Sequence, residues 1–450
     1  MDYNNTDIII ARATPIGKSA LAIIRMSGVG LMDIIQKMWP NSIFQPNHIV
    51  LKKIKLSHSK VVLDSCMIAY YQQPKSFTGE DMMEIFCHGN DINVENIINE
   101  FIKKGVRLAY PGEFSYRAFK NGKIDLLQAE SIAAKINQNS NQYGVALQNL
   151  ESGETSTKIT KLRKKVVNIQ SIIEHELDFN EEEINHITVE EIKKQLTIIM
   201  RGIKEVLTVS LYLQRLEKGY KVVLLGVPNA GKSTLFNRIV GIDKAIVTEV
   251  KGTTRDTLES HIQIKGVPFI FYDTAGYRNT SDQIETIGVE KTIEITKRSD
   301  VVFVLDDLNP KKSFVRLSEQ IPFLKEKECI LIKTKCDDLK NINKKNIIEI
   351  SCKKNLGIDL LLTTLLTSIR VGIEKEDSNN IALCNMRQIN LLERVHEVLQ
   401  EVLKNVNANI EMDIVASQLR TGIDLFEELL GKITSNEILN NIFKGFCVGK

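Results

Sequence analysis

One eight-residue motif near the middle of the chain constrains the fold more than any other feature of the sequence. The segment Gly226-Val-Pro-Asn-Ala-Gly-Lys-Ser233 matches GxxxxGK[ST], with the apolar run Lys221–Leu225 before it and the helix-like run Thr234–Val240 after it. Its glycines allow backbone N–H groups to approach phosphate oxygens at the N-terminus of the helix that follows. The sequence therefore predicts a strand, a phosphate-binding loop and a helix in direct succession.

The residues that follow this motif keep the same alternation of strands and helices. Apolar runs recur at Pro268–Asp273, Val301–Asp306 and Cys329–Thr334, and stretches with helical spacing separate them. Strands that alternate with helices in this way are typical of a parallel, doubly wound sheet. Residues 219–372 are therefore predicted to form a P-loop (Ras-like) α/β domain.

The chain on both sides of this block has a different character. Apolar residues recur at steps of three and four within residues 121–218, and the same period returns within residues 373–450. These two segments are predicted to form one all-α helical domain, into which the α/β domain is inserted. Residues 1–120 mix short β-like runs with turn-rich stretches, which predicts a small α+β domain.

Composition excludes several classes of protein. The chain has 59 Lys and Arg against 56 Asp and Glu, a net charge of +3, which excludes a histone-like basic protein but not a local RNA-binding patch. No apolar run approaches the roughly 18–20 residues of a membrane helix. The seven cysteines form no CxxC pair, which favours a reduced, cytoplasmic compartment, and the seven histidines have no metal-ligand spacing.

Four further motifs follow in the order that is typical of GTPases. They are Gly252-Thr-Thr-Arg-Asp256, Asp273-Thr-Ala-Gly276, Thr334-Lys-Cys-Asp337 and Ser351-Cys-Lys353. A carboxylate at Asp337 can pair with the two N–H donors of guanine, whereas adenine would leave it buried and unpaired. The predicted nucleotide is therefore GTP. The predicted GTP-binding residues are Asn229, Ala230, Gly231, Lys232, Ser233, Thr234, Thr248, Glu249, Val250, Lys251, Gly252, Thr253, Thr254, Asp273, Thr274, Ala275, Gly276, Thr334, Lys335, Asp337, Ser351, Cys352 and Lys353.

The same motifs assign chemical roles around the phosphates. Lys232 places a positive charge beside the β- and γ-phosphates, and the Ser233 hydroxyl can ligate magnesium. Asp273 ends a predicted strand, where its carboxylate can hold the magnesium shell, and Thr254 can complete that shell when a triphosphate is bound. The predicted magnesium ligands are Ser233 and Thr254.

Motifs outside the P-loop block carry a resemblance to a known family. They are Ala13-Thr-Pro-Ile-Gly17, Ile24-Arg-Met-Ser-Gly28, Ser76-Phe-Thr-Gly-Glu-Asp81, Pro111-Gly-Glu-Phe-Ser115, Lys123-Ile-Asp-Leu-Leu-Gln-Ala-Glu130, Leu177-Asp-Phe-Asn-Glu-Glu-Glu183 and Phe446-Cys-Val-Gly-Lys450. With them the chain resembles the translation-factor-related GTPases of the TrmE-Era-EngA-like class, and within that class the MnmE (TrmE) family of tRNA modification GTPases. The resemblance extends over essentially the whole chain.

The resemblance implies a cytoplasmic homodimer without membrane contact, with an N-terminal folate-binding and dimerisation domain. Together with an FAD-dependent partner of the MnmG/GidA type, in a heterotetramer or larger complex, such proteins act on tRNA. They add a carboxymethylaminomethyl or aminomethyl group at C5 of the wobble uridine. The one-carbon unit comes from 5-formyl- or methylene-tetrahydrofolate, and the folate site is implied at Arg25, Glu84, Lys123 and Lys450. Without the resemblance, Arg25 and Glu84 read as ordinary surface charges.

The resemblance also implies an unusual route of GTP hydrolysis. Tyr277 follows Asp273-Thr-Ala-Gly276, so the usual water-orienting Gln is missing and Glu285 takes over that role. A potassium ion replaces an arginine finger when two G domains dimerise. Its implied ligands are Asn229, Thr248, Val250 and Thr253. The alternative interpretation makes Glu285 a solvated charge on a helix and Asn229 a packing residue of the P-loop.

Cys447 and three departures from the family pattern leave questions open. The resemblance places Cys447 beside the one-carbon site, either as a catalytic thiolate or as a residue that shapes the site. Thr334 replaces the usual Asn of the guanine motif, while Lys18-Ser19 and Cys87-His-Gly-Asn90 depart from the pattern of the first domain. The competing function is a ribosome-assembly or membrane-remodelling GTPase switch, which has no reason to bind a folate.

Overall fold

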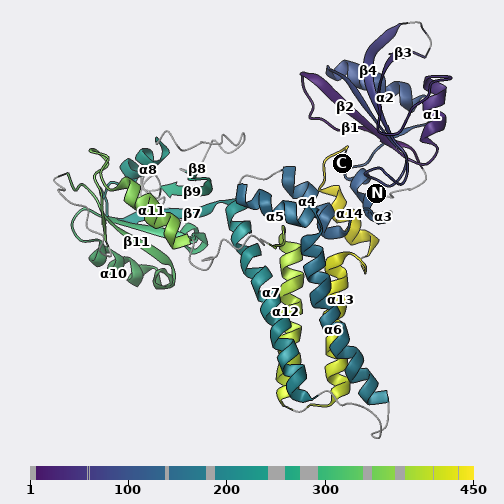
Figure 1. Ribbon diagram of the computed structural model, residues 1–450. Coiled ribbons are helices and arrows are strands. Elements are labelled where there is room, and N and C mark those ends of the chain that lie inside the picture. Colours follow the sequence, from purple (N-terminus) through teal and green to yellow (C-terminus); the bar gives the residue numbers. More distant parts are fainter. Residues whose placement is uncertain are drawn as a thin grey trace. The chain divides into compact units, whose positions relative to one another are not determined.

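The computed structural model describes residues 7–57, 59, 61–136, 141–178, 188–241, 259–273, 292–337, 347–369, 381–408, 410–433 and 435–449. The chain divides into two compact units (Figure 1). The first comprises Met1–Asn137, Ala146–Leu207 and Ile381–Lys450, and the second comprises Gln138–Val145 and Thr208–Asn380. Within the described residues, no helix is long and apolar enough to cross a bilayer.

The first unit contains an N-terminal sheet of six strands in the order β3-β4-β5-β2-β1-β6. Neighbouring strands are antiparallel except for the β1–β6 pair, which is parallel. One face of the sheet packs against two helices, and Ile24, Ile68 and Ile85 lie in that core. The strands are β1 (Ile9–Arg12), β2 (Ser19–Ser27), β3 (Ile49–Lys55), β4 (Val62–Tyr71), β5 (Met82–Gly89) and β6 (Arg107–Leu108), and the helices are α1 (Leu31–Met38) and α2 (Asp91–Ile102).

Asn90, one of the departures from the family pattern, has a local structural role. It lies directly before helix α2 with an extended backbone, and its side-chain oxygen accepts hydrogen bonds from the backbone N–H groups of Ile92 and Asn93. A helix leaves its first N–H groups without partners inside the helix, and an Asn at this position satisfies them. The departure therefore caps a helix that covers the core of the sheet.

The rest of the first unit is helical. Helices α6 and α13 pack against each other although they lie on opposite sides of the inserted segment, and α12 packs against α13. The backbone N–H of Glu191 donates to the Thr188 hydroxyl at 3.2 Å, so Thr188 caps the start of α7. The helices are α3 (Glu113–Lys120), α4 (Leu126–Ile136), α5 (Asn141–Glu151), α6 (Glu154–Asp178), α7 (Val189–Lys218), α12 (Met386–Asn407), α13 (Met412–Leu430) and α14 (Asn436–Lys444). The start of α5 and the end of α7 belong to the second unit.

The second unit contains a sheet in the order β12-β11-β10-β7-β9-β8. The predicted fold class is confirmed, and every residue of the central strand β10 is buried, as expected for a strand covered on both faces. The strands are β7 (Tyr220–Gly226), β8 (Glu259–Ile264), β9 (Val267–Asp273), β10 (Val301–Asp306), β11 (Glu328–Lys333) and β12 (Ile348–Glu349). The helices are α8 (Lys232–Val240), α10 (Pro310–Gln320) and α11 (Ile358–Ile369), with the 3₁₀ turn η2 at Pro322–Glu326.

One strand of this sheet was not predicted from the sequence, and that strand is not parallel to its neighbour. β8 pairs with β9 in the antiparallel sense at the edge of the sheet. Two residues with positive φ, Lys265 at 49° and Gly266 at 79°, connect the strands. This conformation is typical of a tight hairpin turn, which matches the twist of antiparallel strands. A local turn therefore overrides the strand–helix alternation at this edge.

A buried network of charges joins helix α3 to the N-terminal sheet. The Arg117 side chain is 1% exposed, and it donates to Glu113 Oε1 at 3.0 Å and to Glu80 Oε2 at 3.1 Å. Arg107 Nη2 also donates to Glu113 Oε1, at 2.8 Å. Buried charges are tolerated only when they are paired and hydrogen-bonded, so each member depends on the others.

Glu113 gives this network a dependence on pH. Burial raises the pKa of Glu113, but hydrogen bonds from Arg107, from the Tyr110 backbone and from Arg117 more than offset that effect, and the net pKa lies below its ordinary value of 4.5. A group whose pKa is lowered by folding stabilises the fold at pH values above its unfolded pKa. That contribution is lost as the pH falls below 4.5 and passes through the lowered folded value.

We therefore expect Glu113→Gln to reduce the free energy of unfolding of the first unit by about 3–5 kcal/mol at pH 7, because two arginines lose their carboxylate. The difference in free energy of unfolding between wild type and variant should become smaller as the pH falls below 4.5. The single tryptophan, Trp39, is buried in the N-terminal core, so its fluorescence during denaturant titrations reports this unit. Glu95→Gln, which changes an exposed carboxylate on α2, is the control. A difference in free energy of unfolding that does not depend on pH would contradict the role assigned to Glu113.

Candidate functional site

The predicted phosphate-binding loop joins β7 to α8 in the second unit. Asn229 at φ 62° and Gly231 at φ 83° adopt left-handed conformations, so the loop curves and brings its N–H groups to the start of α8. A Cβ atom at Gly226 would lie 2.2 Å from the carbonyl oxygen of Leu305 in β10, so only glycine fits there. Lys232 Nζ donates to the carbonyl oxygens of Gly226 and Val227 at 3.0 and 2.9 Å. The lysine therefore closes the loop around the space where phosphates bind.

The predicted guanine pocket is assembled against this loop. The Thr334 hydroxyl donates to the Ala230 carbonyl at 2.8 Å, which ties the guanine motif to the P-loop. Thr334 therefore supplies a hydrogen-bond donor where the usual Asn is absent. Asp337 Oδ1 accepts a hydrogen bond from the Ser351 hydroxyl at 2.5 Å, and this bond orients the carboxylate before a base arrives. Lys335 Nζ donates to Asp307 Oδ2 at 2.9 Å.

Cys352 and Lys353 follow Ser351 in the same pocket. Burial raises the pKa of the Cys352 thiol, the nearby Arg238 lowers it, and the nearby Asp337 carboxylate raises it further. The thiol therefore stays protonated at neutral pH and behaves as a small packing group. Lys353 is exposed.

Two side chains of this unit fit a magnesium site. Asp273 is 3% exposed and ends β9, where it lies opposite Leu224 of the parallel strand β7. Its carboxylate therefore lies at the end of the sheet from which the P-loop emerges. The Ser233 hydroxyl is exposed in the first turn of α8. Carboxylate and hydroxyl oxygens suit a hard cation, and in the described ranges no group of three or more His, Cys, Asp or Glu forms a metal site of its own.

Part of the predicted site falls on residues that the structure does not describe. In the second unit these are Thr248, Glu249, Val250, Lys251, Gly252, Thr253, Thr254, Thr274, Ala275, Gly276 and Glu285, and in the first unit Lys450. The predicted potassium ligands Thr248, Val250 and Thr253 therefore lie outside the described residues, and Asn229 lies inside them.

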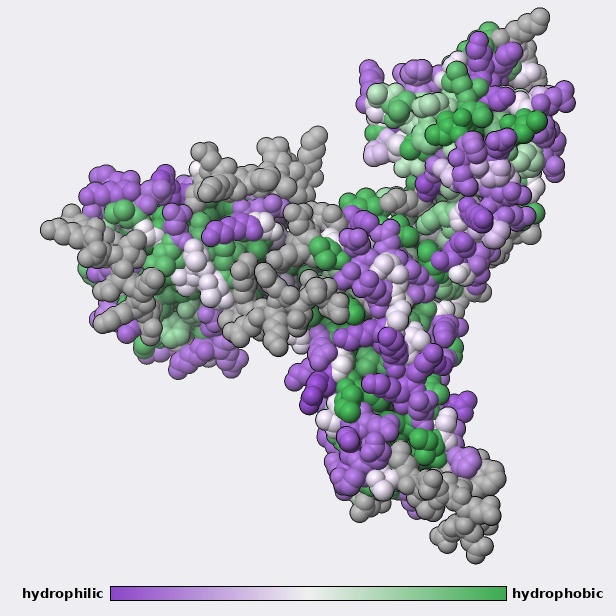
Figure 2. All heavy atoms as spheres, viewed as in Figure 1, coloured by the Kyte–Doolittle hydropathy of each residue, from purple (hydrophilic) through white to green (hydrophobic). Residues whose placement is uncertain are grey.

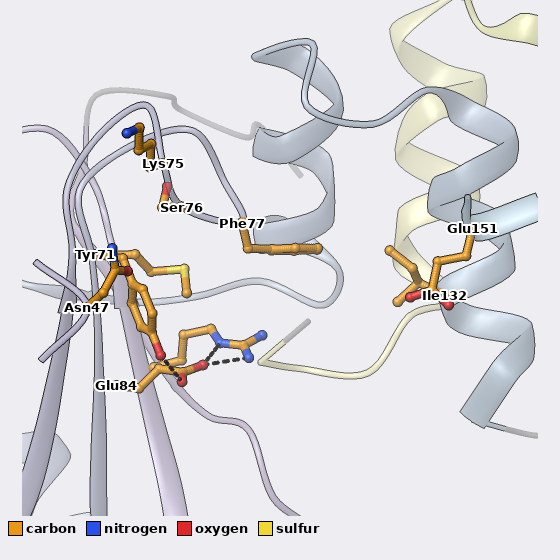
Figure 3. Close-up of a pocket in the computed structure, with 10 residues that line it drawn as sticks. Asn47, Tyr71, Lys75, Ser76, Phe77, Glu84, Ile132 and Glu151 are labelled. Carbon is orange, nitrogen blue, oxygen red and sulfur yellow. Dashed lines mark hydrogen bonds and ion pairs between the residues drawn. The ribbon is translucent and has the colours of Figure 1, made fainter. Parts of the chain in front are cut away.

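The second predicted site, at Arg25 and Glu84, lies at a cavity of about 570 Å³ in the first unit (Figure 3). Arg25 and Glu84 face each other across β2 and β5, and Arg25 Nε and Nη2 donate to Glu84 Oε1 at 3.0 and 2.7 Å. The Tyr71 hydroxyl donates to Glu84 Oε2 at 3.3 Å. The cavity is lined by Arg25, Asn47, Tyr71, Lys75, Ser76, Phe77, Met82, Glu84, Ile132 and Glu151.

The environment of Glu84 holds its carboxylate in a fixed position. Its side chain is 14% exposed, and the guanidinium of Arg25 contacts it through two hydrogen bonds. Burial is the larger of two causes that raise the pKa of Tyr71, and the nearby Glu84 carboxylate is the other. The phenol therefore stays protonated and donates to Glu84. A paired, oriented carboxylate at a cavity is a good acceptor for the N–H groups of a polar ring. The pair is therefore more than two ordinary surface charges.

Lys123, the third predicted folate residue, does not line the cavity. Its Nζ donates to the Pro74 carbonyl at 3.0 Å, and its side-chain carbons lie 3.1 Å from the position that a Cβ atom at Gly79 would occupy. Lys123 therefore supports the loop between β4 and β5.

The cavity residues that the sequence analysis missed are of two kinds. Ser76 and Phe77 belong to a motif noted there without an assigned role, whereas Glu151 carries no sequence signal.

The C-terminal segment Phe446–Gly449 lies against the N-terminal domain. Arg25 Nη1 donates to the Gly449 carbonyl at 3.2 Å, and Gly112 N donates to the Cys447 carbonyl at 3.3 Å. Gly449 has φ 93°, and a Cβ atom there would lie 2.3 Å from the carbonyl oxygen of Arg12. Backbone contacts that only glycine permits therefore hold the segment that carries the exposed Cys447 against Arg25, a residue that lines the cavity.

We expect Gly449→Ala to displace this segment and to increase the rate of hydrogen exchange of the backbone amides of Phe446–Gly449 by about fivefold or more, because left-handed strain alone costs roughly 1–2 kcal/mol. Peptide mapping by mass spectrometry measures the rate. Gly445→Ala is the matched control, because Gly445 has φ −76° and its Cβ would meet its nearest neighbour at an ordinary 3.5 Å. Equal exchange rates in all three proteins would show that the segment does not depend on this contact.

The P-loop, the oriented Asp337 and the buried Asp273 define the second unit as the G domain of a P-loop GTPase. Two family models match the chain: the MnmE helical domain matches residues 126–447, and the GTP-binding protein TrmE N-terminus matches residues 8–123. Proteins described as "tRNA modification GTPase MnmE" match over nearly their whole length. The one from Fervidobacterium nodosum is 36% identical, with 100% of this chain and 99% of that protein covered. The one from Aquifex aeolicus is 36% identical, with 98% of this chain and 99% of that protein covered.

The chain therefore belongs to the MnmE family of tRNA modification GTPases, and the resemblance stated from the sequence is confirmed. It is an enzyme that hydrolyses GTP in tRNA modification. Among solved structures, the G domain of the T. maritima FeoB iron transporter is 26% identical with a TM-score of 0.26, covering 33% of this chain and 98% of that chain. An Aquifex aeolicus Era variant with bound GDP and aluminium fluoride is 22% identical with a TM-score of 0.26. The match covers 40% of this chain and 66% of that chain.

Proposed function

We propose that this chain, with an FAD-dependent partner of the MnmG/GidA type, adds a carboxymethylaminomethyl or aminomethyl group at C5 of the wobble uridine of certain tRNAs. The observation that carries the proposal is the Arg25–Glu84 cavity, which the C-terminal segment adjoins, in the same chain as a guanine pocket. A pure GTPase switch has no use for such a cavity. The proposed domains are residues 1–120 for folate binding and dimerisation, 121–218 with 373–450 for the helical domain, and 219–372 for the G domain.

The folate site is proposed at Arg25 and Glu84, with Lys450 and Cys447 contributed by the C-terminal segment and Lys123 supporting the loop. A tetrahydrofolate derivative, when bound, supplies the one-carbon unit. Glu84 accepts hydrogen bonds from the N–H edge of the pterin ring, and Arg25 fixes the position of the carboxylate. The Arg25 bond to Gly449 keeps the segment that carries Cys447 beside the same cavity. Cys447 is proposed as a catalytic residue of this site.

GTP hydrolysis is proposed to depend on G-domain dimerisation and potassium. Magnesium and potassium ions, when bound, supply positive charge beside the phosphates. Ser233 and Thr254 hold magnesium, and potassium is held by Asn229, Thr248, Val250 and Thr253. Lys232 binds the β- and γ-phosphates, and Glu285 positions the attacking water. The left-handed Asn229 on the outer side of the P-loop supports this arrangement, because its side chain is exposed.

The proposed assembly is a cytoplasmic homodimer that joins the FAD-dependent partner in a heterotetramer or larger complex and acts on tRNA. An apolar surface on the N-terminal sheet supports the dimer. Leu51 lies opposite Met67 on the neighbouring strand, and both are exposed together with Ile49, two residues before Leu51. Figure 2 shows hydrophobic residues at the surface of this domain. Contiguous apolar surfaces of this kind are typical of protein interfaces.

We expect GTP hydrolysis to be faster in potassium than in sodium at equal ionic strength, and to rise more than linearly with protein concentration, because the ion completes a site formed by two G domains. Glu285→Ala should abolish hydrolysis while GTP still binds. Phosphate release and nucleotide binding measure the two effects, with Glu319→Ala, an exposed carboxylate on α10, as the control. Equal rates in both salts would refute the potassium part of the proposal.

The modification itself is tested on tRNA. We expect the purified chain with its FAD-dependent partner, a one-carbon tetrahydrofolate, glycine or ammonium, and GTP to add mass at C5 of the wobble uridine of unmodified tRNA. Glu84→Gln should reduce the product by about tenfold or more, because a neutral amide loses the charge-assisted bonds to a pterin ring. Nucleoside mass spectrometry measures the product. Hydrolysis of GTP with unchanged uridine would favour the switch function.

A further inference from the structure

Two cationic side chains line the cavity, and only one of them is already engaged. Arg25 donates to the Glu84 carboxylate and to the Gly449 carbonyl. Lys75 is exposed on the loop that follows β4, and among the residues that the structure describes its ammonium forms no ion pair or hydrogen bond. A lysine at a cavity with three free donors is suited to bind an anion.

The acidic groups restrict where an anionic part of a ligand can lie. Glu84 and Glu151 also line the cavity, and Glu151 is paired with Lys135. Figure 3 shows Lys75 and Glu151 on opposite sides of the lining residues, Lys75 on the loop after β4 and Glu151 on helix α5. Both glutamates are already paired with cations, so those cations are engaged, whereas Lys75, which has no ion pair within the described ranges, attracts the carboxylates of a ligand. The charges therefore direct an acidic arm toward Lys75.

Lys123 acts on the same loop in a different way. Its ammonium already donates to the carbonyl oxygen of Pro74, the residue before Lys75. Lys123 therefore influences a ligand only through the position of the loop, whereas Lys75 can contact the ligand itself. The roles of the two lysines can be distinguished by comparing a ligand that carries an acidic arm with a ligand that lacks it.

We propose that Lys75 binds the carboxylates of the acidic arm of the folate-type ligand and thereby sets the preference of the cavity for ligands that carry this arm. The inference rests on the folate site of the proposed function. It adds a specificity-determining residue to that site and assigns Lys123 a supporting role. The contact is exposed to solvent, so its contribution weakens as salt is added.

The test uses the full chain and two probes, 5-formyltetrahydrofolate and 6-methyltetrahydropterin, which lacks the acidic arm. Binding of both is measured by calorimetry for wild type, Lys75→Ala, Lys75→Arg and Lys123→Ala. Lys37→Ala, an exposed lysine on α1 away from the cavity, is the control. The measurements are repeated at two salt concentrations.

Lys75→Ala should weaken binding of 5-formyltetrahydrofolate by about fivefold, with a smaller difference at high salt, and leave 6-methyltetrahydropterin unchanged. Lys75→Arg should retain most of the affinity, and Lys123→Ala should weaken both probes by the same factor. If wild type binds the folate and Lys75→Ala weakens neither probe, or both equally, the inference is wrong while the folate site stands. If wild type binds neither probe, the folate site itself fails and the inference with it.

Discussion

The guanidinium of Arg25 is the group on which the arrangement of the first unit's cavity depends. It bonds to Glu84 on the neighbouring strand and to Gly449, which lies 424 residues later in the chain. Its central carbon also lies 5.9 Å from the ring centroids of both Phe77 and Phe114. One side chain therefore connects the sheet, the loop after β4, helix α3 and the C-terminal segment. A lysine could not replace it, because a single ammonium cannot form this fork of directed bonds.

The G domain illustrates how far a sequence can predict a site. The P-loop was predictable because its requirements are local: a strand, glycines where backbones approach closely, and a helix N-terminus. The role of Thr334 was not, because its hydroxyl bonds to Ala230, more than a hundred residues away in the chain. The antiparallel β8 was missed for a different reason. Its direction is decided by the turn at Lys265 and Gly266, and the alternation of strands and helices does not reveal that turn.

The cavity of the first unit was less accessible to sequence reasoning. The family resemblance named Arg25 and Glu84, and their pairing follows from the register of β2 and β5. Glu151 and Ile132 reach the cavity from helices, where nothing in the helical period distinguishes them from other positions. Lys123 belongs to a motif of the family, yet its ammonium is directed at a backbone carbonyl. A motif can thus identify the region of a site without separating the residues that touch a ligand from those that support them.

The uneven exposure of the cysteines has a consequence for oxidative damage. All seven lie in the described part of the chain, and Cys447 is the exposed one among them. Burial raises the pKa of Cys66 to about 12 and that of Cys87 to about 11, so neither thiol reacts readily. Peroxide therefore reaches the C-terminal thiol first and converts it to a sulfenic acid while the folded core stays reduced. Oxidation would therefore alter the C-terminal segment before the folded core, and a thiol reductant would reverse the change.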